Sequence, residues 1–250
     1  MKDRYKKILE LCKEETSVND LIAYFDVSPS TIRRDLVDLE DLGLITRSYG
    51  TVMVNPEQSV EASNEYKALY MAKEKDLIAR YAASLVEDGD IVYIDSGTTT
   101  SSIIEYISAK NILIITNSLD CVEKSKARSF DLSVIGGNYK KRTNALVSTE
   151  TIEAVRRMSY KIAFIAGNGV HPLNGFSCFD ELDAEIKKGV IANAIKTYIC
   201  IDSSKFNQLK KVRFCNLAGA NVITDSRVKD FDYSVFQEVV FVDEILKGKR

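Results

Sequence analysis

Hydrophobic residues near the start of the chain recur at helical spacing in three separate stretches. Within each stretch the apolar side chains lie mostly three or four positions apart, which places them on one face of an α-helix. The three stripes comprise Tyr5, Ile8, Leu9 and Cys12, then Leu21, Ile22 and Phe25, and finally Ile32, Leu36 and Leu39. This pattern predicts three short amphipathic helices.

Helix start and stop signals bound the second and third stretches. Ser17 precedes the second, and Asp20 three residues later gives a pattern close to a capping box. Ser28 and Pro29 precede the third, where a serine suits the N-cap and a proline suits the first helical position. Gly43 is predicted to end this third helix as a left-handed cap.

Two short segments with strand character follow the third helix. Residues 44–47 and 51–54 are rich in apolar and β-branched side chains, and they flank Ser48-Tyr49-Gly50, where the glycine favours a hairpin turn. Three helices followed by a hairpin predict a winged helix-turn-helix domain over residues 1–55.

The remainder of the chain alternates short apolar runs with helical patterns, which is typical of a mostly parallel α/β sheet. Residues 55–59 have the composition of a hinge, and a long polar helical stretch begins near Glu61. We therefore expect a linker and helix over 56–75 and a larger α/β domain over 76–250. The expected strands are 91–94, 112–115, 132–135, 162–166, 197–201, 221–224 and, at one edge of the sheet, 239–242.

Composition excludes several classes of protein. The 250 residues are 45% apolar and 28% charged, as in an ordinary globular protein. No apolar run is long enough to span a bilayer or resembles a signal peptide, so we expect a cytoplasmic protein without a membrane partner. A single histidine, His171, argues against a histidine-based triad or metal site, and no catalytic residue, cofactor or metal is predicted. The cysteines are scattered and are expected to be reduced thiols: Cys12, Cys121, Cys178, Cys200 and Cys215.

Net charge in the first 54 residues does not by itself indicate DNA binding. They hold eight basic and ten acidic side chains, unlike a strongly basic DNA-binding module. If the apolar stripe of the third helix faces the core, however, Arg33 and Arg34 lie on its outward, N-terminal part, where a recognition helix meets bases and phosphates. The alternative is a small helical domain with a solvated arginine pair. The candidate DNA-binding residues are Ser28, Ser30, Thr31, Arg33, Arg34 and, at the base of the hairpin, Arg47.

Polar or glycine-rich residues follow five of the predicted strands. Because ligands bind outside the carboxyl ends of parallel strands, these loops predict a pocket of hydroxyls, backbone N–H groups and the ammonium of Lys205. A helix predicted from Thr99 to Ile107 would add free N–H groups that favour a phosphate. Taken singly, each loop could be a helix cap, a turn or a surface loop. The candidate ligand-binding residues are Asp95, Ser96, Gly97, Thr98, Thr99, Thr100, Thr116, Asn117, Ser118, Gly136, Gly137, Asp202 and Lys205.

The segment VSPSTIRRDLVDLEDLGLITR, from Val27 to Arg47, resembles the N-terminal signature of the DeoR family of bacterial transcriptional regulators. The matching positions are Val27, Ser28, Thr31, Ile32, Arg33, Arg34, Asp35, Leu36, Leu39, Gly43, Ile45 and Arg47. The family usually continues with His-Gly-Gly-Ala after one spacer, whereas this chain has Tyr49-Gly50-Thr51-Val52. The resemblance implies sequence-specific DNA binding, with a different contact at the tip of the wing.

The loops after the strands resemble the effector domain of the same family, which is similar in fold to ribose-5-phosphate isomerase. The matching segments are 95–99, 116–118, 136–137, 184–187 and 202–205, and they add Lys187 to the effector-binding candidates. Ser148 departs from the family, which usually has glycine there. The resemblance implies a sugar-phosphate-sensing domain in a repressor of carbohydrate-metabolism genes. Such a repressor binds double-stranded operator DNA as a homodimer or homotetramer and is relieved by a phosphorylated sugar.

Two other functions fit parts of the pattern. A sugar-phosphate isomerase with an added DNA-binding head would need a general base, usually a carboxylate, beside the reacting carbon. Residues 166–170, where such isomerases carry an acidic loop, contain no carboxylate, although Asp95 and Asp202 remain near the same edge. A DNA-binding architectural protein without a ligand is disfavoured, because it has no evident use for so large a sheet with a polar rim.

Overall fold

The computed structural model describes residues 2–12, 14–41, 44–54 and 61–247. The chain divides between Tyr70 and Met71 into two compact units, Met1–Tyr70 and Met71–Arg250. Within the described ranges, every helix is too short or too polar to cross a membrane.

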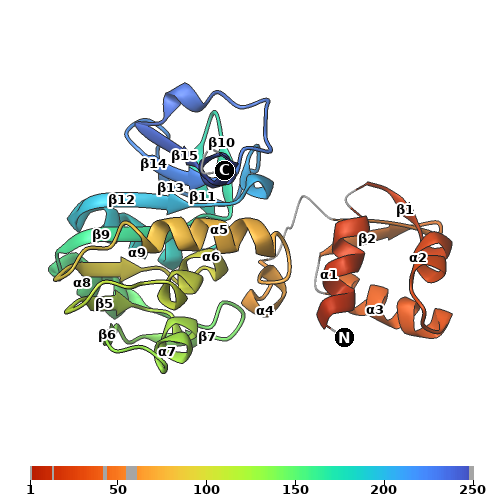
Figure 1. The fold of residues 1–250 in the computed structure, drawn as a ribbon, viewed down its shortest axis with the longest axis horizontal. Helices are drawn as coiled ribbons and strands as arrows, with labels where there is room; N and C mark the ends of the chain where they lie inside the picture. The colour runs from red at the N-terminus through yellow and green to blue at the C-terminus, as the bar shows by residue number, and fades with distance from the viewer. Residues whose placement is uncertain (1, 13, 42–43, 55–60, 248–250) are drawn as a thin grey trace. The chain divides into compact units, whose positions relative to one another are not determined.

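The first unit contains the three predicted helices and the predicted hairpin (Figure 1). Its antiparallel sheet has the order β1-β3-β2. The predicted stripes form its core, in which Ile8, Ile32 and Leu36 are fully buried. The elements are α1 (Lys2–Leu11), β1 (Thr16–Ser17), α2 (Val18–Tyr24), α3 (Pro29–Asp41), β2 (Ile45–Ser48), β3 (Thr51–Val54) and α4 (Asn64–Lys67).

Both predicted helix starts are confirmed. The Ser17 hydroxyl accepts a hydrogen bond from the Asn19 N–H at 3.1 Å. The Ser28 hydroxyl accepts one from the Thr31 N–H at 3.3 Å, and α3 begins with Pro29. The predicted cap at Gly43 lies outside the described residues.

The second unit is built on a seven-stranded parallel sheet, and all seven predicted strands are confirmed with ends shifted by up to three residues. The order is β15-β14-β12-β9-β4-β5-β6, with β15 at the predicted edge position. The strands are β4 (Ile91–Ile94), β5 (Leu113–Thr116), β6 (Asp131–Val134), β9 (Tyr160–Ala166), β12 (Ala194–Cys200), β14 (Asn221–Thr224) and β15 (Glu238–Phe241).

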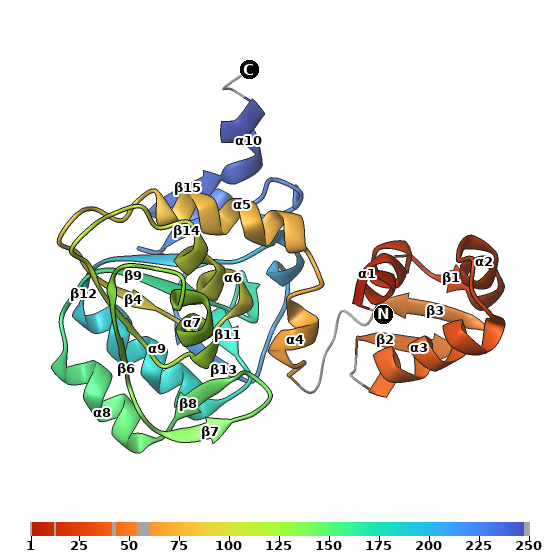
Figure 2. The ribbon, with the colours of Figure 1, turned by 60° about the horizontal axis from the view of Figure 1, so that its bottom comes forward.

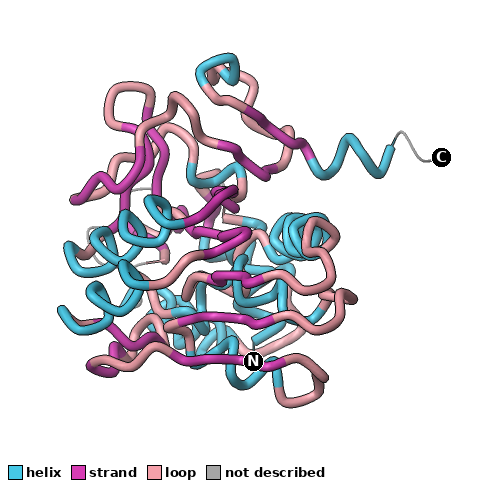
Figure 3. The backbone as a smooth tube through the Cα atoms, turned by 90° about the vertical axis from the view of Figure 1, so that its left-hand side faces the viewer, coloured by secondary structure: helices cyan, strands magenta, loops and turns pink. Residues whose placement is uncertain are grey.

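Helices cover both faces of this sheet (Figure 3). In β4, Val92 and Ile94 face the core beneath α5, whereas Tyr93 faces the opposite core beneath α8 and α9. From β4 the chain adds strands in one direction to β6 and then restarts on the other side of β4 with β9, so a topological switch point lies between β4 and β9. The helices are α5 (Ala72–Ala83), α6 (Thr98–Ser101), η1 (Ser102–Glu105), α7 (Leu119–Ser125), α8 (Thr149–Arg157), α9 (Glu181–Asn193) and α10 (Val242–Lys247).

Two helix predictions need correction. The long helical stretch from Glu61 is two helices, α4 and α5, because the chain turns at Met71, which has a left-handed φ of 54°. The helix expected from Thr99 to Ile107 is the short α6 followed by the 3₁₀ helix η1. Elements without a sequence signal are the short strands β1, β7 (Asn138–Lys140), β8 (Ala145–Val147), β10 (Gly169–His171), β11 (Gly175–Cys178) and β13 (Val212–Cys215), and the 3₁₀ helices η2 (Ser203–Lys205) and η3 (Tyr233–Val235).

Candidate functional sites

The outward face of α3 carries the predicted arginine pair. Ile32 and Leu36 are fully buried, whereas Arg33 and Arg34 are exposed and form no ion pair with any residue that the structure describes. Ser28 is also exposed at the start of the helix. Two uncommitted guanidinium groups near a helix N-terminus suit contacts to phosphates and base edges.

Two acidic residues of α3, Asp35 and Asp38, are turned toward α1. The Asp35 side chain is 2% exposed and forms an ion pair with Arg4, whose Nη2 donates to Oδ1 at 3.1 Å. The Tyr5 hydroxyl donates to Asp38 Oδ2 at 2.5 Å. These contacts neutralise or cover two carboxylates that would otherwise repel DNA, and they fix α3 against α1.

The hairpin places Arg47 beside α3. Its guanidinium lies 3.5 Å from Glu40 Oε2. The Arg47 side chain is 34% exposed and the Glu40 side chain 41% exposed. Such an exposed ion pair is weak, so a DNA phosphate can compete for the arginine. At the tip of the hairpin, Tyr49 has a φ of 40° and is fully exposed.

At the carboxyl edge of the large sheet, Asp95 joins three elements. It follows β4, and its Oδ1 accepts the Ser96 N–H at 2.8 Å. Its Oδ2 accepts the Ala166 N–H, at the end of β9, at 2.9 Å, and it forms an ion pair with Lys187 of α9. The two predicted residues Asp95 and Lys187 are therefore brought together, but as partners of each other at the switch point.

The Asp95–Lys187 pair is buried and charged. Burial alone would lower the pKa of Lys187, but the charge and hydrogen bond of Asp95, together with the nearby Cys178 and Asp183, outweigh burial, and the pKa lies above its ordinary value. The Lys187 ammonium also lies 5.6 Å from the centre of the Phe214 ring. The Asp95 carboxylate is thus committed to an ion pair and two backbone N–H groups.

Several predicted hydroxyl and amide groups hold the loops in place. The Thr100 hydroxyl donates to the Asp95 carbonyl at 2.8 Å, and the Thr116 hydroxyl donates to the Ile94 carbonyl at 2.6 Å. Ser118 caps α7, while Asn117 donates to the Leu146 carbonyl at 3.0 Å. These four residues are buried and shape the edge, whereas Ser96 and Thr98 are partly exposed on it.

Two predicted glycines allow close approach of neighbouring chain segments. A Cβ at Gly97 would lie 2.3 Å from the Ala166 Cβ, and one at Gly137 would lie 2.4 Å from the Thr151 hydroxyl. Because neither distance is sterically possible, the loops after β4 and β6 need glycine to pack as they do.

The loop after β12 presents Lys205 at the same edge. Lys205 is half-buried and forms no ion pair among the described residues. The Asp202 Oδ1 accepts the Ser204 N–H at 3.1 Å, while its buried Oδ2 has no hydrogen-bond partner. Burial would raise the pKa of Asp202, but the charges of Lys205 and Lys75 help to hold it below its ordinary value.

Residues that the sequence did not single out complete this edge. Lys140, in β7, forms an ion pair with Asp183 in the first turn of α9 and lies 3.7 Å from Asp180. This contact ties the β7–β8 hairpin to α9 (Figure 2). The basic run from Lys140 to Arg142, which begins three residues after Gly137, is the signal that could have identified it.

Comparison with known proteins identifies both units. Residues 4–58 match the DeoR-like helix-turn-helix domain family, and residues 71–226 match the DeoR C terminal sensor domain family. The chain is 33% identical over 222 residues to the HTH-type transcriptional regulator IolR of Bacillus subtilis, covering 88% of each protein. It is 31% identical over 232 residues to the lactose phosphotransferase system repressor of Staphylococcus epidermidis, covering 90% of this chain and 92% of the repressor.

Among solved structures, ribose 5-phosphate isomerase A from Methanocaldococcus jannaschii is similar with a TM-score of 0.39 and 18% identity, covering 54% of this chain and 55% of the isomerase. The two family matches cover the helix-turn-helix unit and most of the sheet unit. The chain therefore belongs to the DeoR family of DNA-binding transcriptional regulators.

Proposed function

We propose that the protein binds a double-stranded operator through α3 and the β2–β3 hairpin, and that a phosphorylated sugar at the carboxyl edge of the large sheet controls this binding. In the DNA-bound state, Arg33 and Arg34 contact base edges or phosphates, and Arg47 contacts the backbone. Ser28, Ser30 and Thr31 at the start of α3 supply further hydrogen-bonding groups.

The observation that carries the proposed effector site is that the Lys205 ammonium has no ion-pair partner among the described residues. The other lysine at the centre of this edge, Lys187, is committed to Asp95. Lys205 is half-buried and forms no ion pair with a described residue, so its ammonium is available for a phosphate or a sugar oxygen. The Asp202 Oδ2, which has no partner, can accept a hydrogen bond from a sugar hydroxyl.

The protein is a regulator and not an isomerase. Its relatives are named transcriptional regulators or repressors. Asp95, one of the carboxylates near the edge, is held by Lys187 and by backbone N–H groups, so it is not placed to act as a free general base.

We infer that the regulator acts as a homodimer or homotetramer that represses carbohydrate-metabolism genes. The relatives named as repressors of a lactose phosphotransferase system support this direction of control. Two-fold symmetry sets the spacing of two recognition helices on an operator. An effector that prefers the arrangement unable to bind DNA then releases the operator by its differential affinity for the two states.

The experiment that tests the proposal measures thermal stability of the full chain with glucose 6-phosphate, fructose 6-phosphate, fructose 1-phosphate and ribose 5-phosphate. A sugar phosphate that binds the folded state raises the melting temperature, and the same compound should lower affinity for the operator in a fluorescence-anisotropy titration. The unphosphorylated sugars are the matched controls. A compound that changes neither quantity is not the effector, and failure of the whole set removes support for a sugar-phosphate effector.

A further inference from the structure

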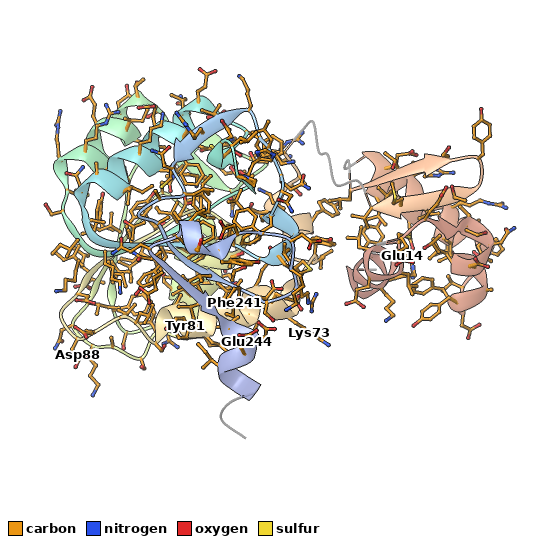
Figure 4. The ribbon with its side chains drawn as sticks, turned by 90° about the horizontal axis from the view of Figure 1, so that it is seen from above. Glu14, Lys73, Tyr81, Asp88, Phe241 and Glu244 are labelled. Carbon is orange, nitrogen blue, oxygen red and sulfur yellow. The ribbon has the colours of Figure 1, made fainter. Side chains whose placement is uncertain are left out.

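Arg227 follows β14 and holds the start of α5. Its guanidinium forms an ion pair with Glu74, whose side chain is only 10% exposed. Its Nη1 also lies 3.7 Å from the Met71 Sδ. Lys73 marks the start of α5 in Figure 4. Arg227, which lies 153 residues after Glu74 in the chain, thus holds this helix start through its side chain.

The same arginine is tied to the Lys205 loop through Asp225. Asp225 is 1% exposed and follows β14, which lies next to β12 in the sheet. Its Oδ2 accepts the Ser203 N–H at 2.8 Å. Its Oδ1 accepts the Arg227 backbone N–H at 3.4 Å and lies 3.9 Å from the Arg227 Nε. One buried carboxylate therefore bridges the loop that presents Lys205 and the arginine that holds α5.

Met71 is the residue at which the chain enters the second unit. Its φ of 54° is left-handed, a conformation that is strained for a residue with a long side chain. Such a residue keeps this conformation only where its surroundings hold it. The Met71 carbonyl accepts the Lys75 N–H at 3.0 Å, and the Met71 sulfur contacts Arg227. The conformation at the junction therefore depends in part on Arg227.

We propose that Arg227 is the positioning residue that couples the Lys205 loop to the junction between the two units. The proposal rests on the effector site described above. A ligand that moves the Lys205 loop moves Asp225 with it, because a backbone hydrogen bond joins them. Arg227 then passes this movement to Met71, where the chain leads toward the DNA-binding unit.

A purely structural role for Arg227 predicts a different result. The Arg227 side chain is 51% exposed, whereas that of Glu74 is 10% exposed, so the ion pair is only partly solvated. If the pair only stabilised the fold, its loss would lower stability and leave the response of the operator complex to the effector intact.

The test compares Arg227→Met and Glu74→Gln with the wild-type full chain. Arg157→Met is the matched control, since Arg157 forms an exposed ion pair with Glu153 within α8. Binding of the most stabilising of the four sugar phosphates is measured by calorimetry, and operator affinity is measured with and without that compound. The wild type and Arg157→Met should show a change in operator affinity within the range of about 5- to 150-fold that is usual for allosteric coupling.

In Arg227→Met and Glu74→Gln the sugar phosphate should still bind and the operator should still bind, but the change in operator affinity should fall below about twofold. A full response in both variants would overturn the coupling role while leaving the effector site in place. Loss of sugar-phosphate binding would make Arg227 part of the ligand site and would equally overturn the proposal. Absence of any response in the wild type would refute the effector itself, and the coupling with it.

Discussion

The ammonium group of Lys187 and the carboxylate of Asp95 form an ion pair although 92 residues separate them in the chain. Their side chains are 8% and 3% exposed. Since Asp95 also accepts the Ala166 N–H, this contact joins α9 to the ends of β4 and β9. The pair thus fixes the point of the sheet from which the proposed effector loops project.

We predict that Lys187→Met destabilises the second unit by about 3–5 kcal/mol, because it leaves the Asp95 carboxylate buried without its partner. Denaturant unfolding of the full chain measures this change. The double variant Lys187→Met with Asp95→Asn removes both charges and should recover most of the loss. A single variant as stable as the wild type would show that the pair is not buried in solution.

The same pair predicts a dependence of stability on alkaline pH. The pKa of Lys187 is raised above its ordinary value of 10.5, because Asp95, with smaller contributions from Cys178 and Asp183, offsets the lowering effect of burial. Stability from a raised pKa is complete below the unfolded-state value and is lost as the pH rises through the folded-state value. The free energy of unfolding should therefore fall more steeply above pH 10.5 in the wild type than in the double variant. Equal slopes would contradict this assignment.

We predict that Arg33→Ala and Arg34→Ala each weaken operator binding by roughly 1–3 kcal/mol if the arginine reads a base edge. If the arginine contacts only phosphate, its loss should instead weaken binding to all sequences alike and reduce the dependence of affinity on salt concentration. Titrations against operator and scrambled DNA at several salt concentrations distinguish these cases. Arg157→Ala, in the second unit, is the control, and wild-type affinity in both test variants would refute the recognition-helix assignment.

The large sheet could be predicted from the sequence because strands buried on both faces are continuous apolar runs. The short antiparallel strands could not. β1 has two residues, and all four residues of β11 are buried, so neither shows the alternation that marks a half-exposed strand. Met71 breaks the expected long helix through its backbone conformation, which the polar pattern around it does not reveal.

Candidate residues for the site could be named from the sequence, but the contacts between them could not. Asp95 and Lys187 were both expected at the ligand, yet in the structure they form an ion pair with each other. The Lys140–Asp183 and Arg227–Glu74 ion pairs were not expected, because each joins residues far apart in sequence. Such pairings depend on the order of strands in the sheet, which hydrophobic spacing alone does not determine.

We predict that Lys205→Ala leaves folding and operator affinity nearly unchanged but weakens the effect of the sugar phosphate on DNA binding. The reason is the loss of a charge-assisted hydrogen bond from a half-buried lysine, which contributes about 1.5–3 kcal/mol. Thr98→Val, which removes one partly exposed hydroxyl while keeping its shape, should have a weaker effect in the same direction. Titration of the operator complex with the sugar phosphate measures both.

For Lys205→Ala, the response to the sugar phosphate and the binding of DNA together distinguish two ways in which the assignment of Lys205 could be wrong. A variant that responds to the same compound at the same concentration would place the pocket elsewhere on the second unit. A variant that no longer binds DNA at all would make Lys205 structural, and the effector would then have to be sought around Lys187 and Asn117.

Our last prediction concerns Tyr49 at the tip of the hairpin. Its φ of 40° followed by 88° at Gly50 forms a tight turn of the kind that favours asparagine and glycine. Left-handed backbone costs an ordinary residue about 1–2 kcal/mol, and asparagine tolerates it better. Tyr49→Asn should therefore stabilise the first unit by about 0.5–1 kcal/mol. Thermal unfolding measures this gain.

The same substitution should weaken operator binding. The Tyr49 side chain is fully exposed, is held in a strained turn and has no partner in the described fold. It is therefore free to contact DNA beside the recognition helix. Tyr49→Phe keeps the aromatic ring and the strained turn, so it should be as stable as the wild type. It should lose operator affinity only if the Tyr49 hydroxyl donates a hydrogen bond to a phosphate. Opposite signs for stability and affinity in Tyr49→Asn are the distinctive outcome. If stability rises while operator affinity and its salt dependence stay unchanged, the tip does not contact DNA, and the arginines of α3 together with Arg47 account for the interface.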